Sequence, residues 1–112
     1  MLRNKLTVFS LEWAPNHFSW SLVDNQELSI KLEEIPVNGS SEPHYHKNSL
    51  QFFFILEGDA VVCVEDQRYQ LKKHEGIEIG LGKRHQILNA GTKDLQFILI
   101  SSPKIQENDI FT

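Results

Sequence analysis

The 112-residue chain has little of what secreted, membrane-spanning or nucleic-acid-binding proteins need. Its single cysteine, Cys63, cannot form an internal disulfide, which favours a reducing compartment such as the cytoplasm. Its longest apolar run, Phe52–Leu56, is far shorter than the ~20 residues of a membrane span. Its formal net charge of −4 argues against a nucleic-acid partner, which usually calls for a basic face. We therefore expect a cytoplasmic protein that binds neither membranes nor nucleic acid.

Internal repeats, linkers and low-complexity segments are absent as well, which limits the chain to one domain spanning residues 1–112. A hydrophobic content of 40%, with 10% aromatic residues, is enough for one globular core. Only the two ends, residues 1–5 and 103–112, are expected to be loose.

Strand-like patterns recur along the chain, and helix-like patterns are nearly absent. Residues 28–33 alternate apolar and polar side chains, as a half-buried strand does, whereas 51–56 are apolar on both faces of the pleat. Further strands are predicted around 18–22, 60–65, 68–71, 77–79, 85–89 and 95–101. Short strands separated by turns about every 8–12 residues predict an all-β barrel or sandwich.

Three histidines and a glutamine are candidate metal ligands: His44, His46, Gln51 and His85. His44 and His46 lie on one face if their segment is a strand, because side chains alternate with period two. Neutral imidazole nitrogens and an amide oxygen suit first-row divalent ions, and such a set leaves coordination positions open for water or substrate. Isolated His-x-His pairs also occur in turns and on surfaces, so the joint spacing carries the metal hypothesis.

This spacing resembles the two signature motifs of the cupin superfamily, over roughly residues 28–102. The first motif would span residues 39–58 and the second residues 74–89. The matching residues are Gly39, His44, His46, Gly58, Gly82, His85 and Asn89. The resemblance is closest to small single-domain cupins with His-Tyr-His and Gln-Phe-Phe segments, here residues 44–46 and 51–53.

Three positions depart from the family pattern. Gln51 stands where most cupins have Glu, Gly80 replaces a usual Pro, and His74-Glu75 replaces a usual Gly-Asp. A neutral Gln51 would hold an ion less tightly and leave it a stronger Lewis acid, or would mark a pocket whose metal binding is weakened or lost.

The resemblance implies a cupin-type antiparallel jelly-roll β-barrel (a double-stranded β-helix) with one divalent ion. It does not distinguish iron, manganese, nickel, zinc and copper. It also implies a small-molecule ligand or substrate, and a metal-dependent enzyme such as a dioxygenase is one interpretation. A non-catalytic small-molecule-binding protein and a sugar isomerase or epimerase are the alternatives, and whether the chain is an enzyme stays open.

Side-chain parity predicts the wall of the pocket. If Gln51 points inward, Phe53 and Ile55 share its face, and we expect Trp20 and Leu32 to complete an apolar wall with few charges. Such a pocket favours a small, largely apolar or aromatic molecule with one or two oxygens for the metal over a sugar phosphate.

The opposite face of the same strand carries Phe52 and Phe54 and would need its own cover. We expect a homodimer formed by sheet packing or by exchange of a strand near residues 6–9, with an internal sheet-to-sheet core as the alternative.

Overall fold

The computed structural model describes all 112 residues as an almost entirely β structure. Its elements are β1 (Ser10–Ala14), β2 (His17–Asp24), β3 (Ser29–Ile35), β4 (Leu50–Glu57), β5 (Ala60–Val64), β6 (Gln67–Leu71), β7 (Gly76–Ile79), β8 (His85–Asn89), β9 (Leu95–Ser102) and the short 3-10 helix η1 (Glu107–Asp109). With η1 as its only helix, the structure offers no helical segment that could cross a bilayer.

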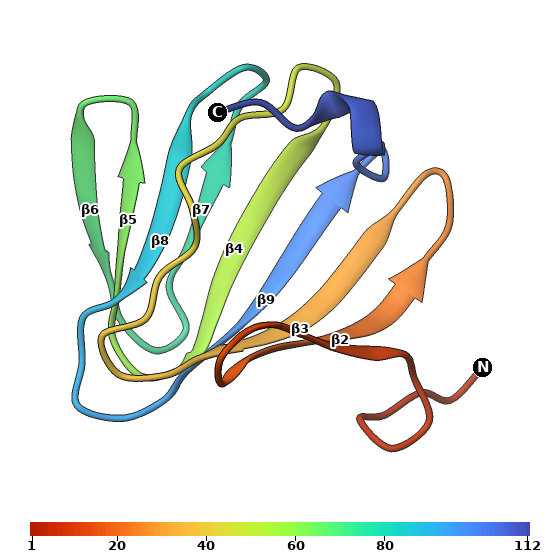
Figure 1. Cartoon of the computed structure of the whole chain (residues 1–112), viewed down its shortest axis with the longest axis horizontal. Coiled ribbons are helices and arrows are strands. Elements are labelled where there is room, and N and C mark those ends of the chain that lie inside the picture. The colour runs from red at the N-terminus through yellow and green to blue at the C-terminus, as the bar shows by residue number, and fades with distance from the viewer.

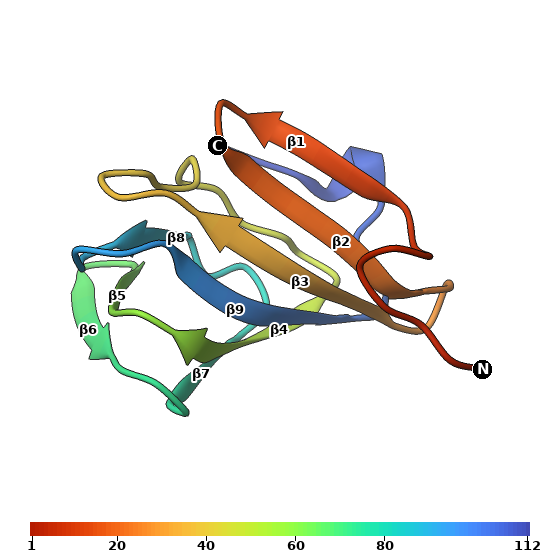
Figure 2. The ribbon, with the colours of Figure 1, turned by 90° about the horizontal axis from the view of Figure 1, so that it is seen from below.

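The strands form two sheets that face one another (Figures 1 and 2). The larger sheet has the order β1-β2-β3-β9-β4-β7 and the smaller the order β6-β5-β8, with antiparallel pairing between neighbours. The segment before β4 extends the smaller sheet, because isolated bridges join Ser40 to Leu88 and His44 to His85. This is the predicted antiparallel jelly roll.

The hydrophobic core lies between the two sheets, toward one end of the strands. It comprises Ile35, Phe53, Ile55, Ala60, Val62, Leu71, Ile79, Ile87, Leu95 and Phe97. Asn89 ties the sheets together at this end, since its side-chain amide donates to the carbonyls of Ile35 (3.0 Å) and Lys93 (2.8 Å). The last residue of the second predicted motif is therefore a structural one.

The inward face of β3 is the polar face, which reverses the sequence-based expectation. In the sheet register Trp20 is opposite Leu32, Leu32 opposite Ile98, and Ile98 opposite Phe54. Directly paired residues lie on the same side of a sheet, so Trp20 and Leu32 share the outer face with Phe54. The prediction that Trp20 and Leu32 line the pocket is therefore wrong. A regular alternation fixes the period of a strand but does not say which side turns inward.

The polar segment after Pro103 is not loose, contrary to expectation. Asp109 in η1 is 3% exposed, and its carboxylate accepts the backbone N–H groups of Lys47 (2.8 Å) and Asn48 (3.0 Å). Phe111 then forms a β-bridge with Tyr45 and stacks on its ring. In Figure 1 this dark blue segment runs beside the loop that precedes β4. Residues 1–5 are exposed, and the first strand begins at Ser10, beyond the 6–9 segment proposed for strand exchange.

Candidate metal centre

Three histidines converge from two segments that lie side by side. His44 and His46 belong to the stretch before β4, and His85 opens β8. The backbone N–H of His85 donates to the carbonyl of His44 (2.8 Å), and the backbone N–H of His44 donates to the carbonyl of His85 (3.0 Å). One ligand atom from each of the three side chains lies within 4.8 Å of the others. The structure thus brings together the three imidazoles that the sequence singled out.

A glycine turn sets the position of His85. Gly82 has a φ of +72°, a left-handed conformation that side-chain-bearing residues rarely adopt. Its N–H donates to the carbonyl of His46 at 2.7 Å, which binds the turn directly to the other ligand segment. The glycine of the second motif therefore holds the two histidine segments together.

Each imidazole is oriented through its Nδ1 atom. The carbonyl oxygens of Glu42, Asp109 and Lys83 lie 2.6, 2.8 and 2.9 Å from Nδ1 of His44, His46 and His85 respectively. A carbonyl can only accept, so Nδ1 carries the proton and Nε2 presents a lone pair. This arrangement, in which the other ring nitrogen is tied to the protein, is typical of metal-binding histidines.

Three of the four candidate ligands carry a buried acceptor atom that has no hydrogen-bond partner: Nε2 of His46, Nε2 of His85 and Oε1 of Gln51. Gln51 is 4% exposed, and its amide nitrogen donates to Oγ of Ser101 at 3.0 Å, which leaves the oxygen free. Buried acceptors without partners are costly and uncommon, and a cation held by the three imidazoles would satisfy both histidine nitrogens. The residues present therefore fit a divalent metal ion.

Burial also keeps two of these imidazoles neutral. It lowers the pKa of His85 to about 4, outweighing the opposite effect of the Lys83 carbonyl. Burial likewise lowers the pKa of His46, and the Asp109 carbonyl offsets only part of that shift. Neutral imidazole is the form that ligates metals, so near pH 7 both side chains are ready to bind without losing a proton.

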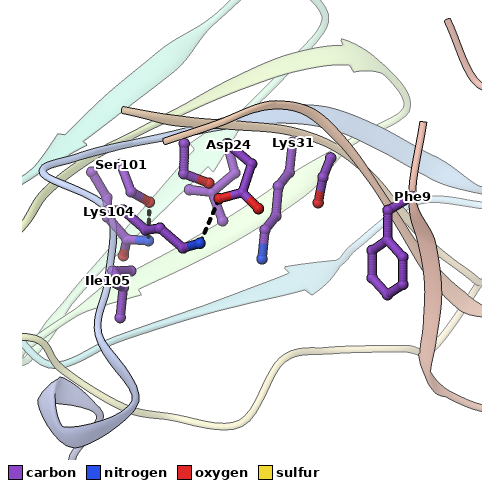
Figure 3. A pocket seen from close by; sticks show the side chains of 10 residues that line it. Phe9, Asp24, Lys31, Ser101, Lys104 and Ile105 are labelled. Carbon is purple, nitrogen blue, oxygen red and sulfur yellow. Dashed lines mark hydrogen bonds and ion pairs between the residues drawn. The ribbon is translucent and has the colours of Figure 1, made fainter. Parts of the chain in front are cut away.

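The surroundings of the centre are apolar on one side and polar on the other. Phe53 and Ile55 lie on the inward face of β4. The rings of Phe53 and His85 pack edge to face, with their centroids 5.9 Å apart. A cavity of about 260 Å³ opens beside Gln51 (Figure 3). Its lining residues are Phe9, Ser21, Asp24, Ser29, Lys31, Gln51, Leu99, Ser101, Lys104 and Ile105. The expectation of an apolar pocket with few charges is therefore wrong, because the polar face of β3 forms part of the wall.

Two inward side chains of β3, Lys31 and Glu33, were not expected near the barrel interior. Burial raises the pKa of the Glu33 carboxyl to about 7, although the Lys31 ammonium opposes the shift. Glu33 does not line the cavity; it lies four residues beyond Ser29, roughly 13 Å along the strand. The signal that could have found both residues is the polar half of the alternation in 29–33.

Known proteins resemble this chain in sequence and in fold. The family model described as Cupin domain matches residues 31–101. The Tetracenomycin polyketide synthase protein TcmJ of Streptomyces glaucescens is 30% identical over 70 residues, which are 62% of this chain and 47% of that protein. The chain spans between 39% and 60% of the length of the curated relatives it matches.

Solved structures share the fold at low sequence identity. A predicted oxalate decarboxylase from Thermotoga maritima has a TM-score of 0.84 at 17% identity, covering 93% of this chain and 100% of that chain. The polyketide cyclase RemF from Streptomyces resistomycificus has a TM-score of 0.80 at 19% identity, covering 100% of this chain and 84% of that chain. At these identities the likeness concerns the fold.

Proposed function

The chain belongs to the cupin domain family, and on that basis we propose that it is a metal-dependent enzyme acting on a small, oxygen-bearing organic molecule. One divalent ion would be held by four side chains: His44, His46, Gln51 and His85. The observation that carries this proposal is the set of buried acceptors without partners, Nε2 of His46, Nε2 of His85 and Oε1 of Gln51.

The donor set supports an open site. Three imidazoles and one amide oxygen are all neutral, so they leave the full charge of the ion in place, whereas a carboxylate would offset part of it. When bound, such an ion supplies Lewis-acid chemistry at a substrate oxygen. The chain's own contribution is to orient the imidazoles through backbone carbonyls and to exclude water with Phe53 on one side.

The class of reaction is narrowed by what the cavity wall lacks. No histidine lines the cavity, and its only carboxylate, Asp24, is paired with Lys104. A general base for sugar isomerisation is therefore not in place. We propose a reaction driven by polarisation of the substrate, such as oxidative cleavage or ring closure. The names of two similar proteins, a polyketide synthase protein and a polyketide cyclase, are compatible with an oxygen-rich substrate.

The test begins with metal content. The purified protein should contain about one equivalent of a divalent metal by elemental analysis, and His85→Ala should lose it. His74→Ala, in an exposed turn, is the matched control and should keep it. Metal content unchanged in His85→Ala would overturn the proposed centre.

Activity then separates an enzyme from a binding protein. Metal-loaded protein is mixed with diols, keto acids and enols while oxygen consumption and product formation are followed. Turnover that disappears in His85→Ala supports the enzyme. Stoichiometric binding of a panel compound without turnover would instead favour the small-molecule-binding protein.

We also propose that a second copy of the chain covers the outer face of the large sheet. That face carries the row formed by Trp20, Leu32, Ile98 and Phe54, and beside it Phe52, which is 37% exposed. The rings of Phe52 and Phe54 stack with centroids 6.3 Å apart. A contiguous apolar face of this kind usually marks an interface, and two-fold packing of identical faces is the commonest solution.

A further inference from the structure

The cavity beside Gln51 lies on the inward face of the large sheet, across the four neighbouring strands β2, β3, β9 and β4. In the register, Gln51 on β4 is opposite Ser101 on β9, which is opposite Ser29 on β3. Two strand spacings, about 10 Å, therefore separate the backbone at Gln51 from that at Ser29. At one end the cavity wall includes Gln51, a member of the proposed ligand set, and the other end reaches β3 and β2.

The far end of the cavity is rich in hydroxyl groups. Ser21, Ser29 and Ser101 all line it. Ser101 already accepts a hydrogen bond from the Gln51 amide, while Ser21 and Ser29 make no side-chain hydrogen bond within the chain. The wall can therefore offer donors and acceptors to a hydroxylated ligand.

The charges along this wall do not cancel. Lys104 forms an ion pair with Asp24 at 2.6 Å, and both side chains are substantially exposed at the mouth of the cavity. Lys31 has no ion-pair partner, and Figure 3 shows its side chain extending into the open space beside that pair. The cavity therefore holds one ammonium group without a counter-charge.

The carboxyl of Glu33, two residues along β3 from Lys31, does not fully balance the charge of the Lys31 ammonium. Glu33 shares the inward face with Lys31, but burial raises its pKa to about 7, so at neutral pH it is only partly ionised. An inward lysine in a small polar cavity is best satisfied by an anionic group from a ligand.

We propose that Lys31 binds the carboxylate of the substrate, and that the substrate is a small polyhydroxylated carboxylic acid. Its hydroxyl groups meet Ser21 and Ser29, and its other end reaches past Gln51 to the metal centre. A carboxylate fits better than a phosphate, because the wall has a single free ammonium, no arginine and no helix N-terminus to balance a dianion. This inference rests on the proposed function and names the substrate class for that site.

Calorimetric titration of the metal-loaded protein tests this assignment. The probes are D-gluconate and D-glucuronate, their neutral counterparts D-glucitol and D-glucose, and D-glucose 6-phosphate. Because these acids also chelate free metal, unbound metal is removed first and metal retention is checked after each titration. At least one acid should bind about tenfold or more tightly than its neutral counterpart and than the phosphate.

Lys31→Met should remove that preference while leaving metal content unchanged. Lys31→Arg should retain most of it. Lys72→Met, at an exposed position just after β6, is the matched control and should retain all of it. Equal affinity for acids and neutral sugars, or an acid affinity unaffected by Lys31→Met, would overturn the assignment. Tighter binding of glucose 6-phosphate would overturn the choice of carboxylate.

The two proposals can fail separately. Metal binding without any effect of Lys31→Met leaves the proposed function standing and removes this subsite. If the protein holds no metal but still binds acids in a way that depends on Lys31, the subsite stands and the proposed metal-dependent function is removed.

Discussion

The backbone carbonyl of Asp109 accepts a hydrogen bond from Nδ1 of His46 at 2.8 Å, across 63 residues of chain. The carboxylate of the same residue caps the backbone of the turn that follows His46, at Lys47 and Asn48. One tail residue therefore fixes both the orientation of an imidazole of the proposed metal centre and the turn that leads into β4.

Replacing Asp109 should loosen the metal centre without touching a ligand. Asp109→Ala removes the acceptor of two backbone N–H groups, so we expect a loss of about 2–3 kcal/mol in the free energy of unfolding. Metal affinity should fall about 10- to 100-fold, because without the carboxylate the tail segment no longer holds the backbone carbonyl of residue 109 against His46. Chemical denaturation and competitive metal titration measure the two effects. Glu107→Ala, exposed in the same 3-10 helix, serves as the control; equal effects of both variants would contradict the assigned role.

Adding a negative charge at Gln51 should strengthen metal binding. Gln51→Glu replaces a neutral amide oxygen with a carboxylate oxygen, which binds divalent cations more strongly. We expect the dissociation constant, measured with a competing chelator, to fall by at least about tenfold. Unchanged affinity would place Gln51 outside the set of ligands.

The stability of the metal-free protein should depend on pH through Glu33. A carboxyl with a pKa of 4.5 in the unfolded chain and about 7 in the folded protein favours the folded state only while it is protonated. Stability therefore falls as pH rises from about 4.5 to above 7, by at most about 3 kcal/mol.

The variant Glu33→Gln should lack this fall. Its stability relative to the wild type should increase between pH 4.5 and pH 8, as followed by urea denaturation across that range. Glu27→Gln, in the exposed turn before β3, controls for the removal of a charge as such. Parallel curves for Glu33→Gln and the wild type would show that the buried carboxyl does not titrate in this window.

A charge in the outer apolar face should separate the proposed dimer. Phe52→Glu places a carboxylate within the stacked pair with Phe54. By light scattering at micromolar concentration, the wild type should have the mass of two chains and the variant the mass of one. Tyr69→Glu changes an aromatic residue on the smaller sheet that is 44% exposed, and it should remain dimeric. A single-chain mass for the wild type would refute the dimer.

The three candidate histidines could be predicted from the spacing within two short motifs. The separation of His44 and His46 puts both on one face of an extended segment, whereas the approach of His85 depends on the long-range pairing of its backbone with His44. The strands could be predicted as well, since alternation and turns are properties of neighbouring residues.

The alternation of polar and apolar residues in β3 could not predict which face of the strand turns inward. Which side of a strand turns inward depends on what covers the other side, and here the apolar side, with Leu32, belongs to the outer face. The role of Asp109 was hidden for another reason. Its partners, Lys47 and Asn48, are more than sixty residues away, and a polar tail has the composition of a solvated one.

Strands β3, β4 and β9 each carry core residues at one end and cavity residues at the other. Stabilising the fold and binding a ligand are therefore divided along the length of the barrel. On β3, Ile35 is fully buried in the core, whereas Ser29 and Lys31 line the cavity. Substitutions at the cavity end should therefore alter which molecules are accepted while leaving thermal stability nearly unchanged. The same barrel can diversify in specificity by single steps at positions 29 and 31, because its hydrophobic core lies at the opposite end.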